Sequence, residues 1–465
     1  MPSMAGFMSD GTEGVKVLLG DQRKGVMALS IPIAIALLVQ NLNNIVDSFW
    51  VADLGQDAMA ALGVVHPLYA ILISIGNGLG IGVSAAIARN IGMKNRDDAN
   101  GVAAQSLLLT LVISVVISPL LIITAEPLFI FMGGGDIIDA CMDYAIPMYL
   151  GTFFIILSGI MSGMLRGEGA ARRSMVIQVV GAIINIVLDP ILIFWCDMGV
   201  AGASWATVIA FVVSSVMAFY WYFRSDDMYI SLDRKNFKPN TRLMKEILNV
   251  GLPESLELSV MNLFNIFLNV LVIMCSGNAG LAVYTMVWRI GFLTAIPAQA
   301  MGGAMVAVCS AEYGMKEFDM IRDAYRFTLK RSFIILVILN LAMALLSGVI
   351  SDIFLRTDDM LFMHQDMVVF ICEMALFMPF FAMIYVGSSL MQSLEKAGQA
   401  MVNTLIRNII MTVGYGIVVL LSGSLIGIGV ALIVIEVFGG IAMVVRGGYV
   451  LRKVSSKYEG TTAVA

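Results

Sequence analysis

Apolar runs of about 20 residues recur along the whole chain, and they limit most strongly what it can fold into. A helix of about 20 apolar residues is long enough to cross the hydrocarbon core of a bilayer. The composition agrees, because 59% of the residues are apolar, 13% are charged and the mean hydropathy is +0.90. A soluble protein with this balance would have no place for its apolar surface. The sequence therefore predicts an all-α polytopic membrane protein.

Short polar breaks divide the apolar runs into twelve predicted transmembrane helices, six in residues 21–223 and six in residues 246–450. The charged stretch 224–245 is interpreted as a linker, and residues 1–20 and 451–465 as tails. The segment GVSAAIARNIGMKNRDDA in the first half resembles AMVAVCSAEYGMKEFDMIRDA in the second. We therefore expect two pseudo-symmetric six-helix lobes, related as parallel repeats about an axis along the membrane normal.

The distribution of Lys and Arg predicts the orientation. Nearly all of them fall at the termini, in the central linker and in every second connection between spans. By the positive-inside rule, we expect both termini and the linker to be cytoplasmic, and an even number of spans agrees with that placement. We expect a multi-pass protein of the plasma (cell) membrane.

One predicted membrane helix carries a polar stripe. Gln40, Asn43, Asn44 and Asp47 recur at helical spacing in the first span. Such a stripe is expected to face the bundle interior or a water-filled cavity, because polar groups are costly in lipid. The alternative is that Asp47 lies near the outer end of the helix and is simply hydrated, with Phe49-Trp50-Val51 forming an interfacial belt.

The fifth span holds a second polar group, in the sequence GAIINIVLDP. Asn185 and Asp189 lie four residues apart and so share one helical face. Pro190 follows directly, and its missing N–H leaves the carbonyl of Ile186 without its helical partner. Charged groups at bilayer depth usually mark ion or proton pathways. The alternative is an Asp that reaches water at a helix end or caps a neighbour.

Asp47 is the expected partner of Asp189. Two carboxylates in one desolvated pocket favour the binding of a proton and titrate as a coupled pair. With the amide oxygen of Asn185 and the hydroxyl of Thr207, they form instead an oxygen cage for a hard cation such as Na⁺. Thr207 equally suits a bond to its own helix backbone. In the second half, Asn269 and Tyr415 align with the two carboxylates, which places the predicted ion site in the first half alone.

The second half of the chain offers second-tier candidates. Glu254 and Glu257 follow Pro253 on the seventh span, Glu373 lies on the tenth, and Arg289 on the eighth is a possible ion-pair partner. A structural ion pair or a charge that snorkels to the interface explains them equally well.

Several segments carry a resemblance to a known family. They are NLNNIVDSFWVADLG (41–55), MSGMLRGEGAARRSM (161–175), NIVLDPILIFWCDMGVAGASWATVIA (185–210) and the helix entry at Pro253. The chain resembles a multidrug and toxic compound extrusion (MATE) transporter over roughly residues 20–450, and its DinF-like, archaeal-type branch in particular.

The resemblance implies roles for particular residues. It implies that Asp47 and Asp189 are the coupling carboxylates and that Asn185 and Thr207 complete the cation site. It also implies that Tyr144 lines the cavity of the N-terminal lobe. Asn43 departs from the pattern, because that branch often has an aromatic residue there.

These features together predict a secondary antiporter that exports organic, cationic or amphipathic compounds in exchange for H⁺ or Na⁺. Bending near Pro190 would link ion binding to the cavity. The sequence leaves the coupling ion open and predicts no other cofactor, no nucleic-acid partner and a functional monomer in contact with lipid. No GxxxxGK[ST] motif or paired-His motif is present, which argues against ATP use and against an enzyme. The main alternative is a flippase for a lipid or lipid-linked oligosaccharide. A non-transporting receptor is a further alternative.

Overall fold

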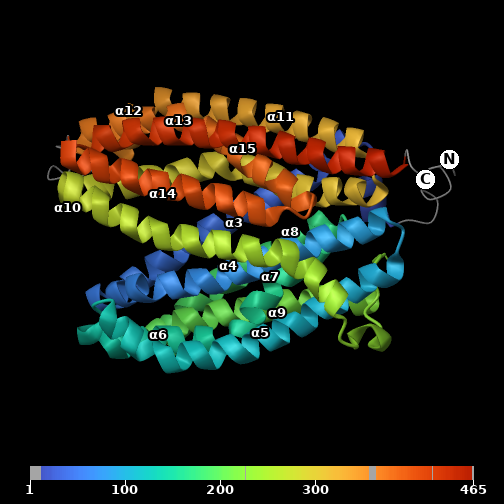
Figure 1. Cartoon of the computed structure of the whole chain (residues 1–465). Coiled ribbons are helices and arrows are strands. Elements are labelled where there is room, and N and C mark those ends of the chain that lie inside the picture. The colour runs from blue at the N-terminus through green and yellow to red at the C-terminus, as the bar shows by residue number, and fades with distance from the viewer. Residues whose placement is uncertain (1–11, 226, 356–362, 422, 463–465) are drawn as a thin grey trace. The chain divides into compact units, whose positions relative to one another are not determined.

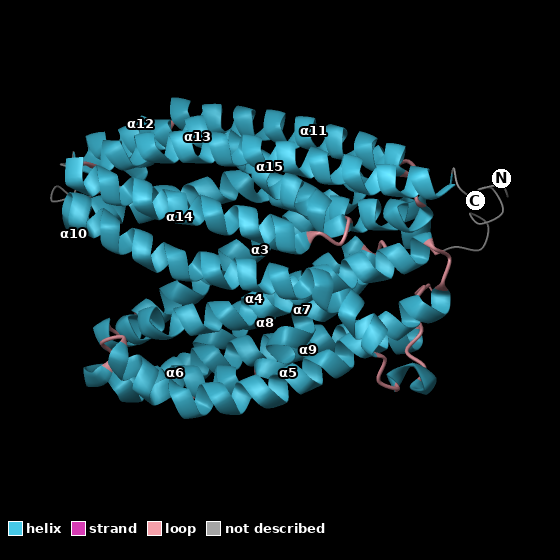
Figure 2. Cartoon of the chain, in the orientation of Figure 1, coloured by secondary structure: helices cyan, strands magenta, loops and turns pink. Residues whose placement is uncertain are grey.

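The computed structural model describes residues 12–225, 227–355, 363–421 and 423–462, and this part of the chain forms helices and no strands (Figures 1 and 2). The helices of the first half are α2 (Glu13–Leu19), α3 (Gln22–Ala52), α4 (Gln56–Gly92), α5 (Arg96–Phe131), α6 (Ile138–Leu150), α7 (Thr152–Gly167), α8 (Ala171–Pro190) and α9 (Gly199–Arg224). Those that follow are α10 (Thr241–Met315), α11 (Phe318–Leu345), α12 (Ser347–Phe354), α13 (His364–Ser393), α14 (Ala397–Leu421) and α15 (Leu425–Thr462). Short helical turns lie at Gly135–Ile137, Ile191–Trp195 and Arg234–Phe237.

The membrane spans match the predicted number. Among the described residues, 10 helices are long and apolar enough to cross a bilayer, and the bent pair α6–α7, with an angle of 52°, adds one more span. The helix α10 has 75 residues and is broken at Gly277, where φ is 67° and ψ is −169°, a backbone conformation that only glycine adopts readily. It therefore counts as two spans, which gives the twelve predicted.

The chain forms two compact units. The first comprises the described residues up to Ser259 together with Val306–Glu317, and the second comprises Val260–Met305 and the described residues from Phe318 onward. Both ends of α10 thus belong to the first unit, whereas the predicted boundaries placed its first five residues in the linker and the rest in the second lobe. The predicted tails also differ, because residues 13–19 form α2 and α15 continues to Thr462. The rest of these tails lies outside the described residues.

In the first unit, glycines let α4 and α7 approach closely. Added Cβ atoms on Gly80 and Gly163 would collide with the backbone of the opposite helix. Small residues at such a contact are typical of helix pairs in membranes, where van der Waals packing replaces the hydrophobic effect. The contact fixes the framework that surrounds α3, α8 and α9.

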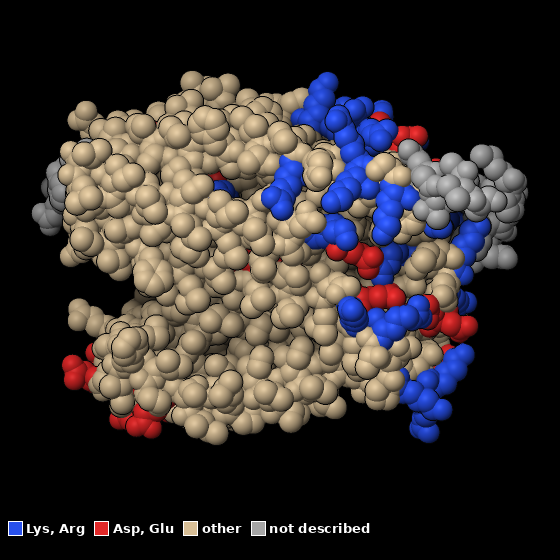
Figure 3. All heavy atoms as spheres, in the orientation of Figure 1, with Lys and Arg blue, Asp and Glu red and all other residues tan. Residues whose placement is uncertain are grey.

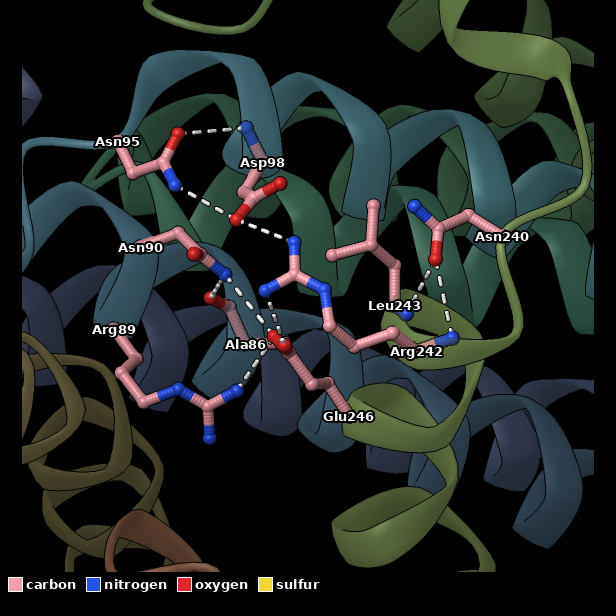
Figure 4. A network of polar contacts seen from close by, with 9 residues as sticks. All are labelled: Ala86, Arg89, Asn90, Asn95, Asp98, Asn240, Arg242, Leu243 and Glu246. Atoms are coloured by element: carbon pink, nitrogen blue, oxygen red, sulfur yellow. Dashed lines mark hydrogen bonds and ion pairs between the residues drawn. The ribbon is translucent and has the colours of Figure 1, made fainter.

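A network of charged residues joins the ends of α4 and α5 to the start of α10 within the first unit (Figure 4). Arg89 Nη2 lies 2.7 Å from Glu246 Oε2, and Arg242 Nη2 lies 2.6 Å from Asp98 Oδ2. Asn240 caps α10, since its Oδ1 accepts hydrogen bonds from the N–H groups of Arg242 and Leu243. The network holds the linker end of α10 against the first unit.

Glu168 fixes the segment that follows α9. It is 2% exposed, and its Oε1 accepts a hydrogen bond of 2.9 Å from the Tyr222 hydroxyl. Its Oε2 accepts from the backbone N–H groups of Tyr229 and Ile230 at 3.1 and 3.2 Å. Burial raises the pKa of Glu168 to about 7, although these hydrogen bonds oppose the rise. The sequence analysis did not identify this residue.

Candidate functional site

The predicted break at Pro190 takes a specific form. α8 ends at Pro190, and residues Ile191–Trp195 form a single π-helical turn in which the N–H of Cys196 donates to the carbonyl oxygen of Ile191 at 2.9 Å. Proline lacks the N–H that would continue the α-helical ladder to Ile186, so the hydrogen-bond pattern changes here. Single π-turns within helices are frequent at functional sites. The irregular turn directly follows the polar face of α8.

Asn185 is the centre of a hydrogen-bonded cluster that joins three helices. Its Oδ1 accepts a bond of 2.7 Å from Asn43 Nδ2 on α3. Its Nδ2 donates to Asp189 Oδ1 at 3.1 Å and to Thr207 Oγ1 on α9 at 3.3 Å. Asn185 and Asp189 are only 2% and 0% exposed. The bond that joins α3 to α8 is thus made by Asn43 and Asn185, and no hydrogen bond joins Asp47 to Asp189 among the described residues.

The cluster has more buried acceptors than donors. Within the described chain, Asp47 Oδ1, Asn43 Oδ1 and Asp189 Oδ2 are buried and have no hydrogen-bond partner. Asp47 and Asp189 are close enough for their charges to interact. A buried acceptor without a partner costs about 1–3 kcal/mol, and more if it is charged. A proton or a cation supplies what such a group of oxygens lacks.

Thr207 fits both roles that the sequence left open. Its hydroxyl donates to the backbone oxygen of Ala203 at 3.1 Å, as a helical threonine often does, and it also accepts from Asn185. Its oxygen thus belongs to the cluster while its own helix fixes its orientation. In the described residues no group of three or more His, Cys, Asp and Glu side chains is placed to hold a metal ion. Any cation here would depend on two carboxylates with amide and hydroxyl oxygens.

The other predicted residues of the first unit differ in how far their side chains are buried. Tyr144 of α6 is 3% exposed within the core cluster of the first unit, and it lies close enough to Asp47 and Asp189 to interact electrostatically. Gln40 is half-buried, whereas Asn44 is exposed. The polar stripe of α3 therefore spans more than one environment.

The second-tier candidates do not form one cluster. Glu254 and Glu257 are buried in the part of α10 that belongs to the first unit, whereas Glu373 and Arg289 belong to the second. Arg289 is exposed and forms no ion pair with Glu373 in the described structure. Glu373 Oε2 is buried without a hydrogen-bond partner among the described residues, next to Gly429, whose missing side chain leaves room for the carboxyl.

The second unit contains a buried ion pair that is not among the residues predicted from the sequence. Arg407 Nη1 on α14 lies 3.0 Å from Glu436 Oε2 on α15, and the two side chains are 8% and 1% exposed. The guanidinium also donates to Asn408 Oδ1 at 3.2 Å and lies over the ring of Phe381. The sequence contains a pattern that predicts this pair. Glu436 is the only charged residue in its apolar span, and that span directly follows the one in which Arg407 is the only charged residue. Arg407 is thus already paired.

A family model and solved structures relate the chain to known proteins. The MatE family model matches residues 32–191 and 253–418. A structure described as the outward-facing conformation of a multidrug resistance MATE family transporter matches with a TM-score of 0.91 and 31% identity, over 96% of this chain and 99% of that chain. A MOP superfamily transporter from Pyrococcus furiosus, described as having a binding pocket of reverse polarity, also has a TM-score of 0.91 and 31% identity, over 95% and 99% of the two chains.

The multidrug export protein MepA of Staphylococcus saprophyticus is 30% identical over 269 residues, and MepA of Staphylococcus aureus is 28% identical over the same length. The matched region spans 57% of this chain and 59% of the length of these curated relatives. The family model covers more than half of the chain, including Asn43 and Asp47 of α3 and Asn185 and Asp189 of α8. The chain therefore belongs to the MatE family, and it is a multi-pass membrane protein of a family of transporters rather than of enzymes.

Proposed function

We propose that the chain is a secondary active multidrug efflux antiporter, which exports organic cationic or amphipathic compounds in exchange for H⁺ or Na⁺. The observation that carries the proposal is the pair of carboxylates Asp47 and Asp189, each of which has one buried oxygen without a hydrogen-bond partner in the described structure. Asn185 bonds to both Asp189 and Asn43, and Asp47 follows Asn43 by four residues on α3. Carboxylates at bilayer depth are costly unless they bind something. The export of drugs by the MepA relatives supports the substrate class.

The same cluster offers two modes of ion binding. A proton on either carboxyl adds an O–H donor to a group that has a surplus of acceptors. Na⁺ would instead be held by oxygens of Asp47, Asn185, Asp189 and Thr207, since hard cations prefer oxygen ligands. Either ion removes negative charge from a dry environment, and no other cofactor is needed.

Coupling to substrate would pass through α3 and α8. The hydrogen bond between Asn43 and Asn185 connects the two helices, so a change in charge at Asp189 acts on α3 as well. The π-turn after Pro190 gives α8 a place where its hydrogen-bond pattern can shift. Ion binding would therefore change the packing of α3 against α8 and lower the affinity for the exported compound.

We also propose that both termini are cytoplasmic and that the chain acts as a monomer. In the first unit the basic residues gather at the ends of α4, α5 and α10 that contain Arg89, Arg96 and Arg242, whereas the opposite ends of α5 and α6 carry Glu126 and Asp139 (Figure 3). Basic residues accumulate on the cytoplasmic side of membrane proteins. A flippase for lipid-linked sugars has less support, because Arg407 is neutralised by Glu436 and is not available for a pyrophosphate.

The experiment is efflux of a fluorescent organic cation from proteoliposomes under a proton gradient or a sodium gradient. Wild type is compared with Asp189→Asn and with the matched control Asp136→Asn, which alters an exposed carboxylate of the same unit. Efflux that is driven by one gradient, lost in Asp189→Asn and kept in Asp136→Asn would support the proposal and identify the ion. Efflux that persists in Asp189→Asn would move the coupling to Glu254, Glu257 or Glu373. No efflux under either gradient would favour the flippase, to be tested by lipid scrambling.

A further inference from the structure

A basic cavity lies between α11 and α15, within the second unit. Its volume is about 330 Å³, which is the lower end of the usual range for sites of small ligands. The lining residues are Arg322, Tyr325 and Arg326 of α11 and Gly448, Leu451 and Arg452 of α15. The lining contains three guanidinium groups and no carboxylate.

The inner wall of the cavity carries a hydroxyl that has no partner. Tyr325 is 6% exposed, and its buried hydroxyl forms no hydrogen bond with the described residues. This oxygen lies 3.7 Å from where a Cβ on Gly447 would be, whereas a Cβ on Gly448 would meet nothing within 4 Å. Gly448 thus leaves this side of α15 open, whereas Leu390 and Gly387 of α13 bound the space beside Gly447 and the Tyr325 hydroxyl. A buried hydroxyl is seldom left unpaired, so this one points to a ligand.

The three arginines have guanidinium N–H groups that are available to a ligand. Arg322 Nη1 lies 2.7 Å from Asp319 Oδ1, which occupies one of its N–H groups, and the aspartate is 90% exposed. Arg326 and Arg452 are exposed and form no ion pair with the described residues. Guanidinium groups bind phosphate oxygens in a bidentate manner, with shorter and stronger hydrogen bonds than neutral donors make.

An apolar surface leads along α15 to the cavity. Phe438, Ile441 and Val445 are 68%, 45% and 67% exposed. They precede Gly448 and Arg452 at alternating spacings of three and four residues, which places all five on one face of the helix. Lys and Arg gather at the same end of α11 and α15 (Figure 3). A ligand with an anionic head and an apolar tail matches this order of surfaces.

We propose that this cavity binds the phosphoryl group of an anionic phospholipid, with its acyl chain along the exposed face of α15. Arg322, Arg326 and Arg452 bind the phosphate oxygens, and the Tyr325 hydroxyl donates a further hydrogen bond. This proposal of a lipid-binding site is independent of the proposal that the chain is an antiporter.

The test is native mass spectrometry of the full-length protein in detergent with dioleoyl-phosphatidylglycerol, and with dioleoyl-phosphatidylcholine for comparison. Wild type is expected to retain phosphatidylglycerol more tightly than phosphatidylcholine. Arg452→Gln should weaken this binding about tenfold, as the loss of a hydrogen bond to a charged group does. Lys453→Gln, which removes the same charge from an exposed neighbour outside the lining, should change it less than about twofold. Tyr325→Phe removes one hydroxyl and should weaken it several-fold.

Gly448→Leu and free phosphate complete the design. Leucine at position 448 fills the open side of the cavity without touching existing atoms near its Cβ, and it should abolish the preference for phosphatidylglycerol. Equal effects of Arg452→Gln and Lys453→Gln, or unchanged binding in Gly448→Leu, would overturn the proposal.

A second experiment adds inorganic phosphate as a competitor of phosphatidylglycerol. If it leaves the lipid bound, the lipid assignment is supported, whereas phosphate binding with no retention of phosphatidylglycerol would overturn that assignment in favour of a soluble anion.

Discussion

The hydrogen bond between Asn43 and Asn185 allows the link between α3 and α8 to be measured. Asn43→Ala removes one donor, and the bond of 2.7 Å that it makes should contribute about 0.6–1.7 kcal/mol within a membrane protein. Asn185→Ala removes this bond and the bonds to Asp189 and Thr207, and it leaves Asp189 Oδ1 without its donor. A hydrogen bond to a charged group adds about 1.5–3 kcal/mol. We therefore expect Asn185→Ala to lower the free energy of unfolding by about 2–5 kcal/mol.

The double variant distinguishes a direct link from two separate defects. If the two side chains act through one bond, Asn43→Ala should cost about 1 kcal/mol less in an Asn185→Ala background than alone. Unfolding in sodium dodecyl sulfate, followed by tryptophan fluorescence, gives the four free energies of the cycle. Asn41→Ala is the control, because Asn41 Nδ2 bonds only to the carbonyl of Leu37 on its own helix. Strictly additive effects, with a coupling below about 0.3 kcal/mol, would refute the view that this bond joins the helices.

Three further variants test other parts of the account. Pro190→Ala restores an N–H at the helix break, and it should remove the π-turn. Efflux from proteoliposomes should then be at least several-fold slower. A normal efflux rate would show that the turn has no role in transport. Burial raises the pKa of Glu168 from 4.5 to about 7, so the folded chain holds this proton more tightly than the unfolded chain. The stability that it contributes is complete below pH 4.5 and is lost as the pH rises through about 7. Glu168→Gln should therefore flatten the dependence of the unfolding midpoint on pH between 5 and 8, and an unchanged slope would contradict the assignment. Arg407→Leu leaves Glu436 buried without its partner and should cost about 3–5 kcal/mol of unfolding free energy, whereas the double variant with Glu436→Leu should recover most of it. A double variant no more stable than Arg407→Leu would show that packing, not charge, holds this contact.

The membrane helices and the polar cluster were accessible from the sequence for physical reasons. A bilayer fixes the length of an apolar span, and helical spacing shows which polar residues share a face. Asn185 and Asp189 on one turn of α8, and Asn43 and Asp47 on one face of α3, were thus identified without coordinates. Asn44 shows the limit of this reasoning, because a stripe with i, i+3, i+4 and i+7 spacing is wide and its edge can face outward.

Other features depend on contacts between distant parts of the chain. Glu168 lies after a helix end in a basic loop, and only the fold brings Tyr222 and the backbone of residues 229–230 to its oxygens. Glu436 becomes a partner of Arg407 only through the packing of α14 against α15. Pro190 predicted a break in α8, but whether a proline gives a kink, an end or a π-turn depends on the neighbouring helices.

Ion binding by the purified protein distinguishes an ion site at Asp47 and Asp189 from one elsewhere in the chain. Proton release into weakly buffered detergent solution and equilibrium binding of radioactive Na⁺ are followed as an organic cation is added. We expect wild type to release one of these ions when the substrate binds. Asp47→Asn and Asp189→Asn should each abolish the release, and Glu373→Gln should leave it intact. Release that survives in both aspartate variants and disappears in Glu373→Gln would contradict an ion site in the first unit.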